Sequence, residues 1–165
     1  MLMADPTLAA VVRTDDVPLL LAPRVSPPLT PAQAVGLDLI LEGFLVHHGT
    51  PRALTRADEE PHGVLAGDYC YASGLVEVSA SGDLFVIRAL ALLVAHSAGL
   101  VAAGRREVLP DLWLGTVAAI AGPRTPVAQE RLDAAFRAVL AGDPEPLADL
   151  AATLADPPDL DAVFA

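Results

Sequence analysis

The sequence predicts an all-α protein, and three observations lead to this prediction. Apolar residues occupy 53% of the 165 positions, whereas aromatic residues occupy only 4%. Much of the apolar content is alanine, leucine and valine, a mixture that favours helices packed on helices. Thr-Pro pairs and glycines separate long apolar segments at the spacing of helix starts and ends, and no useful run alternates with the period of a strand. We therefore expect a single helical bundle spanning residues 1–165.

The charge of the chain excludes one class of partner. The net charge is −11, and all ten basic side chains are arginine. An acidic surface repels phosphate backbones, so we expect no nucleic-acid partner. The single cysteine, Cys70, rules out an internal disulfide and a cysteine-rich zinc site, and we expect a small buried side chain there.

Residues 1–29 predict a proline-rich extension on the surface of the bundle. It begins with a short helical pattern, Thr7–Arg13, and its expected anchor is Leu19–Leu21. Aspartates stand where a signal peptide would need a basic region and an apolar run. We therefore expect a cytoplasmic location.

The first long helix is predicted from Thr30 to about His48. Thr30-Pro31 combines a capping hydroxyl with proline at the first helical position, and Gly49-Thr50-Pro51 ends the pattern. Arg52–Glu60 is polar and reads as a loop.

Residues 63–104 form the most apolar stretch, and they predict two helices, Gly63–Ala80 and Leu84–Ala103. Their alanines and glycines allow close approach, so we expect a buried central hairpin that the other helices cover. The second helix is long enough to cross a bilayer, but Arg88 and His96 interrupt it. We expect a buried core helix and no stable membrane insertion.

Three further helices and a tail complete the prediction. Trp113 lies in a helix at Asp111–Ala121, Thr125-Pro126 starts a helix at Val127–Ala141, and Asp143-Pro144 starts a shorter helix to about Leu154. An acidic tail, residues 156–165, could end in one docked turn.

The sequence lacks the common catalytic motifs: no glycine-rich phosphate loop, HExxH, CxxC or GxSxG is present. His47 and His48 could join Asp58–Glu60 in a metal site, but neighbouring side chains on a helix point about 100° apart. Ordinary histidines at a helix end are the favoured interpretation. His96, on an apolar helix, is interpreted as a core or interface histidine.

The segment around Asp68 is the most unusual polar feature. Asp68 falls between apolar residues of a helix expected to be buried, where a carboxylate needs hydrogen-bond donors. A structural brace is the favoured role. Tyr69 and Tyr71 point to different sides of the helix, so one of them is expected to meet a neighbouring helix or a partner chain.

Leu65-Ala66-Gly67-Asp68-Tyr69, followed by an alanine-rich helix, a Gly-Asp turn and a second apolar helix, resembles the trans-polyprenyl diphosphate synthase family. Leu37–His47 is similar to the helix that presents the family's first aspartate-rich motif. The likeness covers Thr30–Gly104. It implies a truncated version of the all-helical isoprenoid-synthase fold.

The chain departs from the family at its catalytic motifs. Where the family has Asp-Asp-x-x-Asp, this register gives His48-Gly49-Thr50-Pro51-Arg52, with degenerate motif positions at His48, Gly49 and Arg52. The second aspartate-rich motif has no counterpart. Because Mg²⁺ needs carboxylate oxygens, we expect no cofactor on this chain and Mg²⁺ only in a catalytic partner.

The resemblance implies a non-catalytic regulatory small subunit of a heteromeric trans-prenyl diphosphate synthase. Its partner would be the catalytic large subunit, and in isolation the chain could form a homodimer. The resemblance places Leu41, Phe44 and Leu45 beside the product tunnel, with Phe44 as the chain-length candidate and a plain core role as the alternative. It places Asp68, Tyr69 and Tyr71 at the subunit interface.

Three alternatives stay open. The first is a stand-alone helical interaction or scaffold protein derived from the same fold. The second is an enzyme of different chemistry that uses a metal at His47, His48 and Asp58–Glu60. The third is a carrier of a small apolar ligand.

Overall fold

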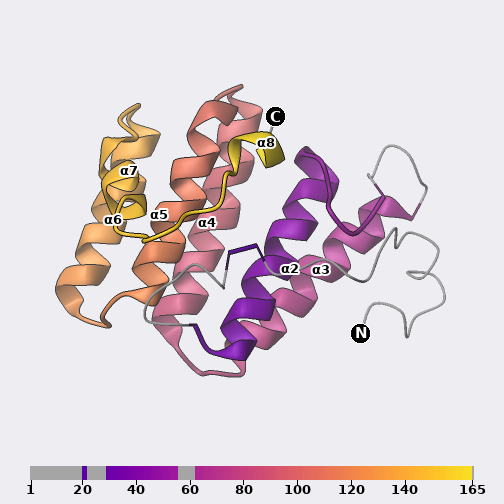
Figure 1. Cartoon of the computed structure of the whole chain (residues 1–165), viewed down its shortest axis with the longest axis horizontal. Coiled ribbons are helices and arrows are strands. Elements are labelled where there is room, and N and C mark those ends of the chain that lie inside the picture. Colours follow the sequence, from indigo (N-terminus) through magenta and orange to yellow (C-terminus); the bar gives the residue numbers. More distant parts are fainter. Residues whose placement is uncertain (1–19, 22–28, 56–61, 165) are drawn as a thin grey trace.

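The computed structural model describes residues 20–21, 29–55 and 62–164, and within these ranges it is helical, with no β-strand. This confirms the all-α prediction. The helices lie side by side in Figure 1, with α2 and α3 on one side of the molecule and α6 and α7 on the other. In chain order, they are α2 (Pro31–His48), α3 (Gly63–Ser79), α4 (Leu84–Ala102), the 3-10 turn η3 (Arg106–Val108), α5 (Leu109–Ala121), α6 (Pro126–Leu140), α7 (Glu145–Ala151) and α8 (Asp161–Phe164).

The predicted helix starts at the two Thr-Pro pairs are confirmed. The Thr30 hydroxyl accepts a hydrogen bond from the Gln33 amide at 3.2 Å, and the Gln33 side chain accepts one from the Thr30 amide at 3.1 Å. The two bonds form a complete capping box. At α6, the Thr125 hydroxyl accepts from the Ala128 amide at 3.1 Å.

Two expected helices differ from the structure, and a third cannot be compared with it. The helix containing Trp113 starts earlier, at Leu109, directly after η3. The α7 helix ends at Ala151 because the Thr153 hydroxyl and amide both bond back to the Leu150 carbonyl in a turn. Thr7–Arg13 lies outside the described residues.

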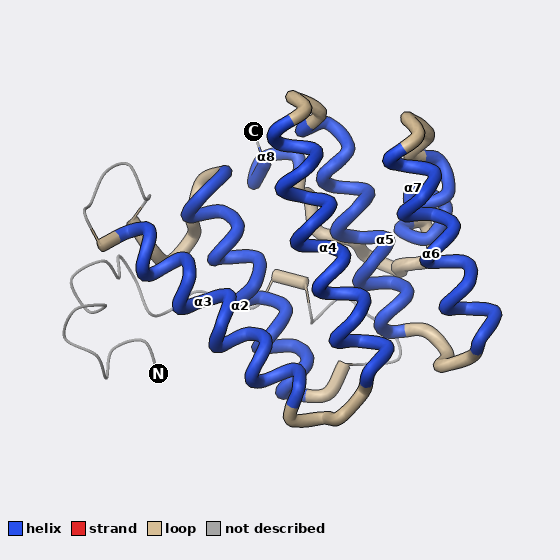
Figure 2. The backbone as a smooth tube through the Cα atoms, turned by 180° about the vertical axis from the view of Figure 1, so that it is seen from behind, coloured by secondary structure: helices blue, strands red, loops and turns tan. Residues whose placement is uncertain are grey.

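The prediction that α3 and α4 form a buried central hairpin is wrong. The α3 helix packs along α2, and α4 packs along α5, so α3 and α4 diverge from the turn that joins them (Figure 2). In the view of Figure 2, α3 and α4 lie in front of α2 and α5. Each of the two helices is therefore covered on one side by its other neighbour in the chain, α2 for α3 and α5 for α4.

Glycines on α2 and α3 explain this choice of partner. Gly36 and Gly43 lie two turns apart on α2, as Gly67 and Gly74 do on α3. A Cβ atom at Gly74 would lie 2.6 Å from the Gly36 carbonyl oxygen, and one at Gly43 would lie 2.8 Å from the Gly67 carbonyl oxygen. The two antiparallel helices are in backbone contact at both pairs, which larger side chains would prevent.

The core centres on α5. Eleven of its thirteen residues are buried, including Trp113. The same core takes in Phe44 of α2, Leu90 and Leu93 of α4 and Phe136 of α6. A helix buried nearly all round is expected to be mostly apolar, and α5 has only two polar side chains, Asp111 and Thr116.

The prediction that α4 is a buried core helix is wrong for the outer side of this helix. It is the one helix of the described residues long and apolar enough to cross a membrane by length and composition, with a mean hydropathy of 2.1. Only 33% of the 18-residue window is buried. Leu84, Ala91, Ala95 and Ala98 are exposed on its outer side.

Both ends of the described chain dock on the bundle. Leu21 is buried in the core, consistent with its expected role as an anchor, while Leu19 lies outside the described residues. The acidic tail ends in the short helix α8. Leu160, just before this helix, and Phe164, at its end, are both buried. The docked turn is therefore present.

Candidate functional sites

The turn after α2, where the family resemblance places a metal-binding motif, caps the helix. The Gly49 amide donates to the Leu45 carbonyl at 2.9 Å, and a Cβ at Gly49 would lie 2.7 Å from Leu45 Cδ2. The His48 ring lies 4.9 Å from the ring of Phe44, and the His48 carbonyl accepts a hydrogen bond from Arg106. Burial, together with the positive charges of His47 and Arg106, lowers the pKa of His48.

Arg52, the third degenerate motif position, belongs to a buried polar network on α2. Its guanidinium lies 2.9 Å from Asp38 Oδ1 and 3.5 Å from Glu42 Oε2. Asp38 also accepts hydrogen bonds from the amides of Leu20 at 2.7 Å and Leu21 at 3.3 Å. Burial raises the pKa of Asp38, although these bonds and the Arg52 charge act in the opposite direction.

Glu42 fixes the loop that follows the turn. Its carboxylate accepts hydrogen bonds from the amides of Arg52 at 3.1 Å, Ala53 at 2.7 Å and Leu54 at 3.0 Å. Asp38 and Glu42 thus attach two separate chain segments to one face of α2.

The sequence analysis did not single out these two acids. The signal for them was present, because two carboxylates spaced four residues apart interrupt an otherwise apolar helix. Because the two carboxylates hold residues 20–21 and 52–54 against α2, the arrangement is interpreted as a structural clamp.

Asp68 is exposed, so the expectation of a buried carboxylate is wrong. Its side chain is 65% exposed, and Oδ1 lies 3.2 Å from His47 Nε2. The imidazole of His47 stacks on Tyr71 with ring centroids 5.8 Å apart and an angle of 5° between the planes. A Cβ at Gly67 would lie 2.5 Å from His47 Nε2, so only a glycine at this position leaves room for the imidazole.

Tyr69 and Tyr71 lie on different sides of α3, as expected. Tyr69 packs on a small second cluster that includes Leu54 and Cys70, while Tyr71 packs against the main core. Burial raises the pKa of the Cys70 thiol to about 12 and also raises the pKa of Tyr71. Cys70 is therefore an unreactive buried thiol.

Leu41, Phe44 and Leu45 are fully buried. The Phe44 ring lies 5.6 Å from Trp113 and 5.7 Å from Phe164, in edge and tilted arrangements that favour aromatic contact. All three side chains belong to the main core, and Phe44 contacts aromatic rings of α5 and α8 there.

An exposed apolar stripe runs along the outer side of α3. Leu65 and Val76 are 57% and 67% exposed, and both lie on the side of the helix away from α2. We call this surface the α3 stripe; it comprises Val64, Leu65, Ala72, Leu75 and Val76, with Asp68 beside them. Monomeric proteins rarely leave contiguous large apolar side chains uncovered, so the stripe is a candidate docking surface.

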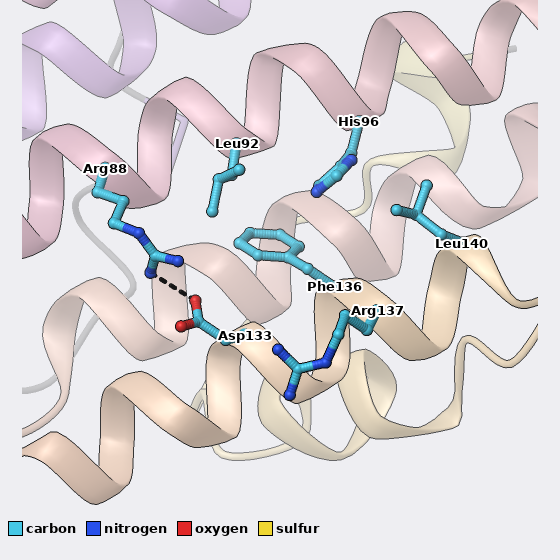
Figure 3. Close-up of a pocket in the computed structure, with 7 residues that line it drawn as sticks. All are labelled: Arg88, Leu92, His96, Asp133, Phe136, Arg137 and Leu140. Carbon is cyan, nitrogen blue, oxygen red and sulfur yellow. Dashed lines mark hydrogen bonds and ion pairs between the residues drawn. The ribbon is translucent and has the colours of Figure 1, made fainter.

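A cavity of about 160 Å³ lies between α4 and α6 (Figure 3). His96, interpreted from the sequence as a core or interface histidine, lines it and is half-buried, 5.1 Å from the ring of Phe136. Burial lowers the pKa of His96.

No group of three or more metal-ligating side chains occurs among residues 20–21, 29–55 and 62–164. The acidic segment Asp58–Glu60, which the metal hypothesis requires, lies outside these ranges. Of the two histidines in that hypothesis, His47 pairs with Asp68.

Comparison with known proteins gives no relative. No family, no curated protein and no solved structure matches the chain. The isoprenoid-synthase likeness therefore depends on the quoted motifs alone, and the function it implies stays a prediction.

Proposed function

We propose that this chain is the non-catalytic regulatory small subunit of a heteromeric trans-prenyl diphosphate synthase. It supports the activity and the product chain length of a catalytic partner, which carries the Mg²⁺. The observation that supports the proposal is the α3 stripe, because the helix that carries Leu65-Ala66-Gly67-Asp68-Tyr69 leaves its apolar side uncovered.

The charge of the chain favours a different partner over a second copy. Two copies with a net charge of −11 each repel one another. A catalytic subunit with an apolar face and basic residues at its rim complements both the α3 stripe and Asp68.

The test is a prenyltransferase assay with an allylic diphosphate, isopentenyl diphosphate and Mg²⁺. It compares this chain alone, the catalytic subunit from the same source alone, and the mixture, with size exclusion to detect a complex. Activity or a changed product length only in the mixture supports the proposal. Prenyl diphosphate formation by this chain alone would overturn it, and so would the absence of both a complex and an activity change, which would favour a scaffold protein.

Matched surface variants locate the docking face. Leu65→Gln combined with Val76→Gln is expected to abolish the complex, because it makes the α3 stripe polar. The control is Val127→Gln on α6, an apolar residue that is 73% exposed and lies outside the stripe. Equal complex formation by the double variant and the control would show that the α3 stripe is not the docking face.

A further inference from the structure

The cavity lies between one face of α4 and one face of α6 (Figure 3). The α4 residues follow one another at four-residue intervals, and the α6 residues are related by steps of three and four, so each set occupies one face of its helix. The lining residues are Arg88, Leu92 and His96 from α4 and Asp133, Phe136, Arg137 and Leu140 from α6.

The floor of this cavity is apolar. Leu92 and the ring of Phe136 point into it, and Leu140 stands at its edge with 57% of its surface exposed. A cavity near 150 Å³ is enough to hold a six-carbon ring. The volume of about 160 Å³ therefore suits one small apolar group.

The charged groups around the cavity do not cancel. Arg88 Nη1 lies 2.5 Å from Asp133 Oδ1, and this ion pair joins α4 to α6 across one end. The side chain of Arg137, one turn further along α6 than Asp133, has no hydrogen bond or ion pair with any residue that the structure describes. Burial lowers the pKa of His96, which disfavours the charged imidazolium. One guanidinium of the rim thus remains without a counter-charge.

We infer that the α4–α6 cavity is a binding site for a small monocarboxylate with an apolar body, such as an aromatic carboxylate. The apolar body occupies the floor over Phe136, and the Arg137 guanidinium donates paired hydrogen bonds to the carboxylate. A single negative charge matches the one uncompensated cation. A phosphate dianion fits less well, because the Asp133 carboxylate in the same rim repels it. This inference is independent of the proposed function.

The test is a titration of the full chain with benzoate, followed by two-dimensional NMR of the backbone amides. Benzyl alcohol has the same ring without the charge, and it serves as the ligand control. Arg137→Gln is the test variant, and Arg131→Gln is its match, because Arg131 is exposed on the same helix, has the same charge and does not line the cavity.

We expect benzoate to shift the amides of the lining residues with a Kd of about 1 mM, and benzyl alcohol to bind about tenfold more weakly. Arg137→Gln should weaken benzoate binding about tenfold, whereas Arg131→Gln should change it less than about twofold. The inference is overturned if benzoate shifts no lining residue, if benzyl alcohol binds equally well, or if the two arginine variants behave alike.

Discussion

The backbone contact between α2 and α3 makes a strong prediction about Gly74. A Cβ atom there would lie 2.6 Å from the Gly36 carbonyl oxygen and 2.6 Å from Ile40 Cγ1. The isoleucine side chain can rotate away, but the carbonyl belongs to the α2 backbone. Gly74→Ala therefore forces the two helices apart by several tenths of an ångström.

The size of the effect follows from two opposing terms. Alanine is favoured over glycine inside a helix by about 1 kcal/mol. Overpacking of a tight contact costs about 1–3 kcal/mol, and the separation also loosens the neighbouring contacts. We expect Gly74→Ala to lower the free energy of unfolding by about 1–2 kcal/mol.

A matched control separates the two terms. Gly99 lies inside α4, and a Cβ there has no atom within 4 Å. Gly99→Ala should therefore raise the free energy of unfolding by up to about 1 kcal/mol. Urea unfolding, followed by far-UV circular dichroism and by the fluorescence of the single tryptophan, Trp113, measures both variants. If Gly74→Ala is as stable as Gly99→Ala, the inferred backbone contact is wrong.

Two further predictions concern buried and capping carboxylates. Glu42→Gln should lower the free energy of unfolding by about 2–4 kcal/mol, because one acceptor oxygen becomes an NH₂ group that faces either the Arg52 amide or the amides of Ala53 and Leu54, and because the negative charge beside Arg52 is lost. Glu130→Gln, at an exposed position of α6, should have little effect. Urea unfolding distinguishes these outcomes, and equal stability of the two variants would contradict the clamp. Burial alone would raise the pKa of Asp83, but hydrogen bonds from Arg124 and from two amides of α4 lower it below 3.8. This stabilisation is present above pH 3.8 and is lost as the pH falls through the folded-state pKa of Asp83. Asp83→Ala should therefore lower the free energy of unfolding, measured in urea, by about 1 kcal/mol at pH 7 and by less near pH 3. A cost independent of pH would show that the charge has no role.

Much of the helical content could be predicted from local sequence. Thr30-Pro31 and Thr125-Pro126 start helices because capping and the fixed φ of proline act within a few residues. The turn at Gly82 is equally local, because its φ of 65° suits a glycine. These features need no knowledge of which helix lies beside which.

The candidate sites depended on contacts between distant segments. The carboxylates of Asp38 and Glu42 are explained only by the approach of residues 20–21 and 52–54 to α2. The cavity beside Arg137 requires α4 and α6 to meet, although they are separated in the sequence by α5. Periodicity along the chain cannot supply such pairings.

The sequence by itself determined the all-α class, the helix starts at the two Thr-Pro pairs and the apolar character of α4, because propensity, capping and hydropathy are properties of short segments. Only the tertiary structure decided that α3 pairs with α2 and not with α4. The physical reason is that glycines at matching intervals on α2 and α3 allow backbone contact. That pairing turns Asp68 and the apolar side chains of α3 towards the surface.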